Sequence, residues 1–389
     1  MRKIPEDLGR FERRSLGLGL LAAVLGLIAG LARPDIFFRA YLVAYLFWIG
    51  ISLGCLAILM LQNLSGGSWA IVIRRLLEAG ARTLPLMAIL FLPLLPGLHH
   101  LYEWTHADVV SADEVLRAKS AYLNVPFFLV RAAVYFAVWI GLAGLLARWS
   151  REQDDVSSPA PARKMQSLSG PGLAALVLTV TFASVDWVMS LEPHWYSTIY
   201  GALFLAGFAL SALAFAVTVL VLLTRQEPLR SAVTPAHLHD LGKLLFAFVM
   251  VWAYFSFSQL LIVWAGNLPE EIPWYLRRLE GGWRFVGIAV ALGQFALPFV
   301  LLLSRSTKRD PRILPRIALL AIVFRFVDVS FMIVPAFEGP GRPIVLLSAL
   351  LALAVGGLWL AAFFRRLRQH PLLPVNDPHL EEALAHGRH

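Results

Sequence analysis

The sequence predicts an all-α integral membrane protein with about ten transmembrane helices, and three observations lead to this fold class. Of the 389 residues, 58% are hydrophobic and only 15% are charged, so a soluble fold would leave more apolar surface in water than is tolerated. The apolar residues lie in runs of about twenty, the length that a helix needs to cross the hydrocarbon core. Lys and Arg are abundant in every second connection between these runs.

Ten apolar segments meet the length criterion, and the connections between them are short and polar. In order along the chain they are 16–32, 41–61, 84–98, 122–147, 172–191, 198–223, 244–265, 285–304, 313–335 and 344–364. The third is the weakest, because it is short and contains three prolines, and we expect it to begin further upstream. Residues 1–389 are therefore expected to form one membrane domain, with an ordered or draped polar tail over 365–389.

The distribution of Lys and Arg predicts the orientation. One set of connections, together with residues 1–14 and 365–389, carries roughly three times as many Lys and Arg as the other set. Both termini are therefore expected in the cytoplasm, which fits an even number of helices. The net charge of +9 is assigned to the lipid interface. Nucleic acid is not an expected partner, because no basic run is interleaved with stacking aromatic residues.

The cysteine and histidine content argues against a redox centre in this chain. Cys55 is the single cysteine, so the chain cannot hold an iron–sulfur cluster or a covalently attached haem. All ten histidines fall in predicted loops, helix ends or the tail, and none lies at mid-membrane, where a bis-histidine haem needs its ligands. We expect no metal and no cofactor in this chain.

Four charged residues lie inside predicted transmembrane helices, where charge is costly and usually paired. They are Arg131, Asp186, Arg325 and Asp328. Each lies roughly 9 to 15 Å from the outer end of its helix, and Gln259 lies at a similar depth. We expect them to converge in one buried network in the outer half. This network is either a static salt-bridge cluster or a site for proton relay or a quinone headgroup.

Further polar residues extend this pattern toward both surfaces. Ser190 and His194 continue outward from Asp186 on one helical face. At the cytoplasmic end, Lys243 lies near two histidines and an aspartate where the seventh helix begins, which suits either a proton entry point or an ordinary solvated helix start.

Two acidic, Trp-containing outer loops are predicted to dock an extrinsic partner, although interfacial aromatic residues are also common without one. The loop residues concerned are Glu192, Trp195, Glu270, Glu271 and Trp274.

An internal repeat relates the fifth and ninth helices. When the two segments are aligned, Asp186 matches Asp328 and Pro193 matches Pro335. Both helices run in the same direction, so we expect two tandem four-helix bundles, over residues 41–192 and 198–335, with one flanking helix at each end.

Three stretches resemble a known family. SVDWVMSLEPHWYSTIYG (184–201), AYFSFSQLLIVWAGNLPEEIPWY (253–275) and RFVDVSFMIVPAF (325–337) resemble the ActF-type subunit of alternative complex III. This subunit belongs to the NrfD/polysulfide-reductase-like membrane family. The ten-helix layout also agrees with the resemblance.

The resemblance implies a quinol-oxidising complex in the inner membrane of a bacterium. The implied partners are an iron–sulfur subunit, haem c subunits and a second NrfD-like membrane subunit, with a cytochrome c or a terminal oxidase as the electron acceptor. The ActF-type subunit has no redox centre and a proposed proton pathway. The polar membrane positions of the family map onto Asp186, His194, Lys243, Arg325 and Asp328, whereas Arg131 lies outside the matching motifs.

The leading hypothesis is therefore a cofactor-free membrane subunit of a quinol:electron-acceptor oxidoreductase with a proton path. A second is that the chain itself binds quinone, using a donor such as His194 or Gln259 in a polar set with Ser190 and Tyr254. A third is a secondary transporter with tandem repeats. The simplest is a structural anchor for periplasmic subunits.

Overall fold

The computed structural model describes residues 7–337, 339 and 341–385, and this part of the chain is helical without any strand. Ten helical segments within it are long and apolar enough to cross a membrane. They are α1 (Asp7–Ala32), α2 (Pro34–Ser65), the broken segment α3–α5 (Arg74–Leu101), α8 (Val125–Asp155), α9 (Ala160–Trp187), α10 (Tyr200–Leu223), α12 (Pro235–Gly266), the segment α14–α15 (Trp283–Leu303), α17 (Leu314–Ile333) and α18 (Gly341–Leu367). The prediction of an all-α, multi-pass membrane protein is confirmed.

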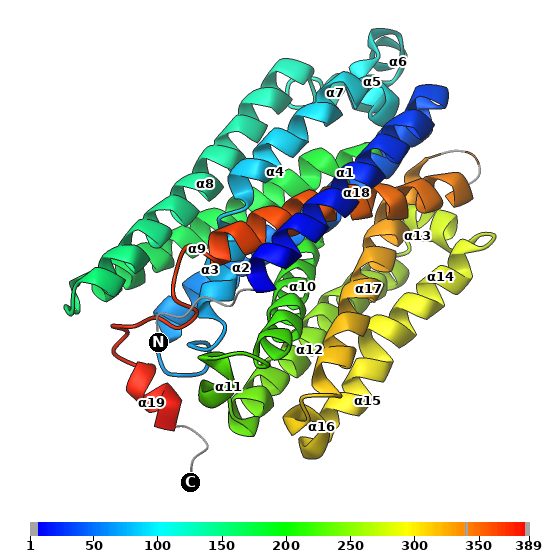
Figure 1. Cartoon of the computed structure of the whole chain (residues 1–389). Coiled ribbons are helices and arrows are strands. Elements are labelled where there is room, and N and C mark those ends of the chain that lie inside the picture. The colour runs from blue at the N-terminus through cyan, green and yellow to red at the C-terminus, as the bar shows by residue number, and fades with distance from the viewer. Residues whose placement is uncertain (1–6, 338, 340, 386–389) are drawn as a thin grey trace.

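The short helices mark the two ends of the bundle (Figure 1). At one end lie both termini of the described chain, with α11 (Leu229–Ala232), α16 (Arg305–Arg309) and α19 (Leu380–Ala385). We call this end the terminal face. At the opposite face lie α6 (Ala107–Ala112), α7 (Glu114–Lys119) and α13 (Ile272–Leu279).

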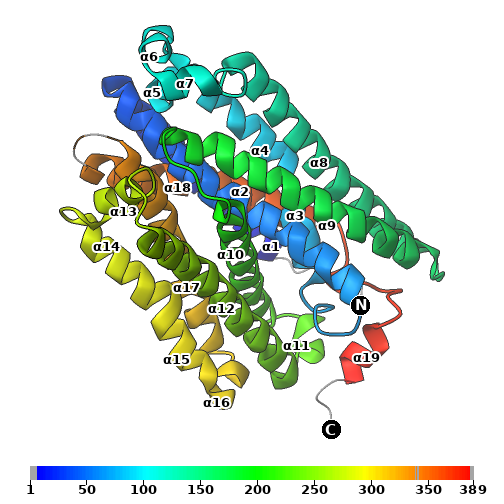
Figure 2. The same ribbon diagram turned by 180° about the vertical axis from the view of Figure 1, so that it is seen from behind.

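Apart from α1 and α18, the transmembrane helices can be described as two groups of four that share an extensive contact between α2 and α10. The first consists of α2, α3–α5, α8 and α9, and the second of α10, α12, α14–α15 and α17. Seen from behind, α2, α9 and α10 run along the junction of the two bundles (Figure 2). The flanking helices α1 and α18 pack along each other, and α18 lies against α2.

The centre of the molecule is α2, which is apolar on all sides and almost completely enclosed by other helices. A helix of this kind belongs in the core of a bundle, whereas α1 and α12 expose most of their apolar surface, as lipid-facing helices do. Close packing at the core depends on glycine, because Gly54 of α2 lies against the backbone of Phe208 on α10.

The third transmembrane segment begins at Arg74, upstream of the apolar run, as expected. It is broken into α3 (Arg74–Ala81), α4 (Leu84–Phe91), a 3-10 turn (Leu92–Gly97) and α5 (Leu98–Leu101). Pro85 lies in the first turn of α4, where a missing N–H is tolerated. Pro93 and Pro96 fall in the 3-10 turn, which cannot continue as a regular α-helix around them. A second irregularity, the π-helical turn Ala291–Ala296, separates α14 (Trp283–Val290) from α15 (Leu297–Leu303).

The tail after α18 lies back over the terminal face. Leu372 and Leu373 are buried, and the imidazole Nε2 of His237 lies 2.9 Å from the carbonyl oxygen of Ala383. The expected ordered tail is thus present up to Ala385.

The α2–α10 contact predicts a sharp difference between two glycine-to-alanine substitutions. A Cβ at Gly54 would overlap the carbonyl oxygen of Phe208, so Gly54→Ala should destabilise the protein by about 1–3 kcal/mol, the usual cost of overpacking. Gly141→Ala is the control, because nothing lies near that position on α8, and alanine should stabilise the helix there by about 1 kcal/mol. Thermal unfolding in detergent measures both, and equal effects would contradict the close contact.

Candidate functional site

The first buried ion pair joins α8 to α9. Nε of Arg131 donates to Oδ2 of Asp186 at 2.8 Å, and Nη2 donates to Oδ1 at 2.9 Å. The hydroxyl of Tyr135 donates to the same carboxylate at 2.7 Å. Nη1 of Arg131 donates to the carbonyl oxygen of Tyr122 at 2.9 Å, and the guanidinium lies over that ring at 3.8 Å. This bidentate arrangement is the strongest geometry for an arginine–carboxylate pair, and it occupies both carboxylate oxygens of Asp186.

The second buried ion pair lies within α17. Arg325 and Asp328 are one turn apart, and Nη1 of Arg325 donates to Oδ2 of Asp328. From α12, the indole N–H of Trp252 donates to the same oxygen at 3.2 Å. The guanidinium of Arg325 packs against Gly207 on α10. Its Nε and Nη2 atoms are buried and have no hydrogen-bond partner in the described chain.

The structure differs from the expected single network of four charges. Across residues 7–337, 339 and 341–385, no hydrogen bond or ion pair joins Arg131 or Asp186 to Arg325 or Asp328. The two aspartates occupy equivalent positions in the repeat, but their arginines do not. Arg131 comes from the preceding helix, whereas Arg325 comes from the same helix as its partner. Each charge is therefore neutralised locally, within its own bundle.

The other expected proton-path residues lie away from both pairs. His194 is exposed, and its Nε2 atom lies 2.7 Å from a carboxylate oxygen of Asp113. Lys243 is exposed, and its ammonium lies 2.9 Å from a carboxylate oxygen of Asp240. Neither residue contacts a buried pair, so the described structure shows no polar path from these residues to Asp186 or Asp328.

Ser190 and Tyr254 also lie outside the expected polar network. The hydroxyl of Ser190 donates to the carbonyl oxygen of Asp186, one turn earlier in the chain, at 2.6 Å. This is ordinary local bonding by a serine near a helix end. Tyr254 is 66% exposed, on the outside of α12.

The two loops at the opposite face are fastened to each other. The rings of Trp195 and Trp274 stack at 4.9 Å, and both side chains are buried. Glu192 accepts hydrogen bonds from Arg277 at 3.1 Å and from Arg278 at 2.8 Å. We call Glu192, Trp195, Trp274 and Arg278 the loop clamp.

The loop clamp corrects the expectation that all five loop residues dock a partner. Glu192, Trp195 and Trp274 are committed to contacts within the chain, so they are not free for docking. Glu270 is exposed and Glu271 is partly exposed, and these two remain available.

Arg278 is the central residue of the loop clamp, and sequence reasoning did not single it out. Although it is 1% exposed, it donates to Glu192 and to the carbonyl oxygens of Trp274, Phe331 and Met332. Burial lowers the pKa of Arg278, while the carboxylate of Glu192 favours its charged form. The sequence feature that could have indicated a buried arginine here is the pair of arginines at the end of the amphipathic segment IPWYLRRL.

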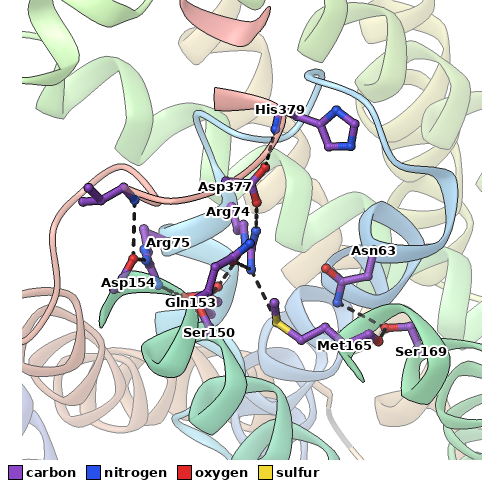
Figure 3. Close-up of polar contacts among 12 residues, drawn as sticks. Asn63, Arg74, Arg75, Ser150, Gln153, Asp154, Met165, Ser169, Asp377 and His379 are labelled. Carbon is purple, nitrogen blue, oxygen red and sulfur yellow. Dashed lines mark hydrogen bonds and ion pairs between the residues drawn. The ribbon is translucent and has the colours of Figure 1, made fainter. Parts of the chain in front are cut away.

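A second cluster that sequence reasoning missed lies at the terminal face (Figure 3). Arg74 and Arg75 of α3 bind the carboxylates of Asp377 and Asp154, and both also bind Glu78. We define the terminal-face cluster as Arg74, Arg75, Glu78, Ser150, Gln153, Asp154 and Asp377. It joins α3, the end of α8 and the tail. The sequence feature that could have indicated this cluster is the Arg-Arg-x-x-Glu spacing, which places both arginines within reach of the glutamate on a helix.

His370 borders this cluster. Its Nε2 atom lies 3.0 Å from Nη1 of Arg82. Burial lowers the pKa of His370 to about 4, and the nearby cations Arg75 and Arg82 add to this effect. His370 is thus neutral at pH 7 and accepts a hydrogen bond from Arg82.

Gln259 lies in a polar recess at the opposite face. It is buried and lines a cavity of about 110 Å³ together with Ser197 and Glu271. The hydroxyl of Ser197 lies 3.4 Å from Oε1 of Gln259. Val263 lines both this cavity and a mainly apolar groove of about 390 Å³ between α12 and α13. The polar recess and the apolar groove are therefore neighbours on α12.

Comparison of the chain with models of known protein families gave no match, and neither did comparison with curated proteins. In the described part of the chain, no group of three or more His, Cys, Asp or Glu residues could hold a metal ion. The function is therefore argued from the geometry above and from the resemblance of the three motifs.

The position of His370 predicts a pH-dependent tail. Because the folded protein holds the pKa of His370 below its usual value near 6.5, the stability that comes from the neutral imidazole is complete above that value. It is lost as the pH falls from about 6.5 toward about 4. Limited proteolysis of the tail should therefore accelerate in this range, and His370→Gln should flatten the response. His99→Gln, at an exposed site, is the control. Identical profiles for wild type and His370→Gln would contradict this assignment.

Proposed function

We propose that this chain is a membrane subunit, without a redox centre of its own, of a quinol:electron-acceptor oxidoreductase of the alternative complex III type. Its partners would be an iron–sulfur subunit, haem c subunits and a second NrfD-like subunit in a bacterial inner membrane. The Lys and Arg bias supports a cytoplasmic terminal face and a periplasmic loop clamp.

One observation carries the proposal: the two long motifs behind the resemblance pack against each other. Glu192 and Trp195 belong to the first motif, and Trp274 belongs to the second. They meet in the loop clamp, and Glu192 follows the end of α9 by five residues. Motif residues that are far apart in the sequence therefore maintain one structure, which supports a shared structural role for the two motifs at the face where Glu270 and Glu271 remain accessible.

Asp186 and Asp328 are the proposed protonatable groups, and their surroundings give them different roles. Both oxygens of Asp186 are held by Arg131. At Asp328, both contacts in the described chain use Oδ2. Asp328 is therefore held less completely than Asp186, whose two carboxylate oxygens both accept hydrogen bonds.

The proposal predicts what this chain purifies with. A tagged chain, extracted from native membranes in mild detergent, should bring down multihaem and iron–sulfur proteins in stoichiometric amounts, as seen by mass spectrometry and by haem absorption. A chain that purifies alone and without colour would contradict the proposal and favour the transporter.

In the intact complex, Asp328→Asn should lower proton release per turnover, with Asp310→Asn at the terminal face as the control. Unchanged proton release with normal assembly would refute the relay.

A second candidate, a quinone site in this chain, is favoured by the recess at Gln259. An amide donor in a polar recess that adjoins an apolar groove of about 390 Å³ suits a carbonyl headgroup on an apolar tail. A photoreactive quinone should label α12 or α13, native quinone in excess should protect, and Gln259→Leu should reduce labelling several-fold. Tyr254→Phe, on the exposed side of the same helix, should have no effect. Labelling confined to another subunit would exclude this candidate.

A further inference from the structure

A basic hollow lies at the terminal face, where the ends of three transmembrane segments meet. It lies between α3, the last turns of α8 and the end of α18 with the start of the tail. The residues that line it are Arg75, Glu78, Ala79, Arg82, Ala147, Arg151, Arg366, Leu367 and His370. Four of these nine are arginines, and only one is a carboxylate.

The single carboxylate in the hollow is already fully engaged. Oε1 of Glu78 accepts from Nε of Arg74 at 3.1 Å and from Ser150 at 2.7 Å, while Oε2 accepts from Arg75 at 2.7 Å. Glu78 is also buried. It therefore has little capacity left to neutralise the remaining cations of the hollow.

Three of the four arginines have no acidic partner in the described part of the chain. Arg82 contacts only the neutral groups of His370 and Gln369, and no ion pair involves Arg151 or Arg366. The fourth, Arg75, is buried, and its Nε atom has no hydrogen-bond partner although Nη1 and Nη2 do. Converging guanidinium groups with unused donors favour an anion, and phosphate matches their planar fork.

The depth of the hollow indicates where the anion comes from. The helix α8 has 31 residues and so spans about 46 Å, more than the ~30 Å of the hydrocarbon core. Arg151 lies near the end of α8, and Arg366 lies in the last turn of α18. Both are therefore at the level of the lipid headgroups. Leu145, nearly two turns further in on α8, is exposed and is positioned to contact acyl chains.

We propose that this hollow binds the phosphate group of an anionic phospholipid from the leaflet at the terminal face. The enclosed space is about 10 Å³, room for roughly one water molecule, so the phosphate lies at the rim rather than inside. In this arrangement Arg151 on α8, Arg366 on α18 and Arg82 after α3 contact the phosphate group. Basic pockets between transmembrane helices are a known mode of headgroup recognition. The lipid would thereby link α3, α8 and α18 at a point where their charges otherwise repel.

Lipid binding to the purified, delipidated full-length chain tests this proposal. Native mass spectrometry and thermal unfolding are recorded with phosphatidylglycerol, with phosphatidylcholine and with inorganic phosphate alone. Wild type should retain phosphatidylglycerol and be stabilised by it, with little effect from phosphatidylcholine. The double variant Arg151→Gln/Arg366→Gln should bind phosphatidylglycerol about tenfold more weakly, because it loses two of the guanidinium groups that line the hollow.

The matched control is Arg148→Gln/Arg365→Gln, which changes two exposed arginines of the same helices outside the hollow. It should bind like wild type. An equal loss of phosphatidylglycerol in both double variants would mean that only surface charge matters, and would overturn the proposed site. Equal stabilisation by inorganic phosphate without any gain from phosphatidylglycerol would overturn the lipid as the occupant.

Discussion

A charge inside a bilayer must find an opposite charge, and this constraint decides how the helices of this protein are placed. The chain meets it locally and several times over. Arg131 and Asp186 fix α8 against α9, and Arg325 and Asp328 occupy the interior of the second bundle, where Trp252 ties α12 to α17. The same rule extends to both faces. Arg278 fastens the two opposite-face loops, and the terminal-face cluster holds α3, α8 and the tail together.

The helices themselves follow from the sequence because bilayer thickness sets the length of an apolar run, and hydropathy reports that length directly. Hydropathy is less informative where charges enter the bundle. The short apolar run of the third segment indicates that the helix begins upstream of Leu84, but it does not indicate that Arg74, Arg75 and Glu78 are buried. Their burial depends on partners in α8 and in the tail, far away in the sequence. No single segment carries that information.

The candidate site shows the same limit. Depth is predictable, because each residue advances a helix by a fixed rise, and all four intramembrane charges are indeed buried. Partner choice is not predictable, because it depends on the rotation of each helix and on which neighbour it faces. Asp186 and Asp328 are equivalent in the repeat, yet one takes its arginine from another helix and the other from its own. Trp195 and Trp274 resembled exposed interfacial aromatics, but they stack on each other.

The central claim is that the two buried aspartates lie in separate sites, so that any proton exchange at one does not depend on the other. A double-mutant cycle between Tyr135→Phe and Trp252→Phe tests this most directly, because each substitution removes one hydrogen bond to one aspartate and leaves both ion pairs in place. Each should cost about 1–2 kcal/mol in the free energy of unfolding measured in detergent. The account predicts that the two costs add to within about 0.5 kcal/mol, whereas a coupling energy above about 1 kcal/mol would show that the charges form one network.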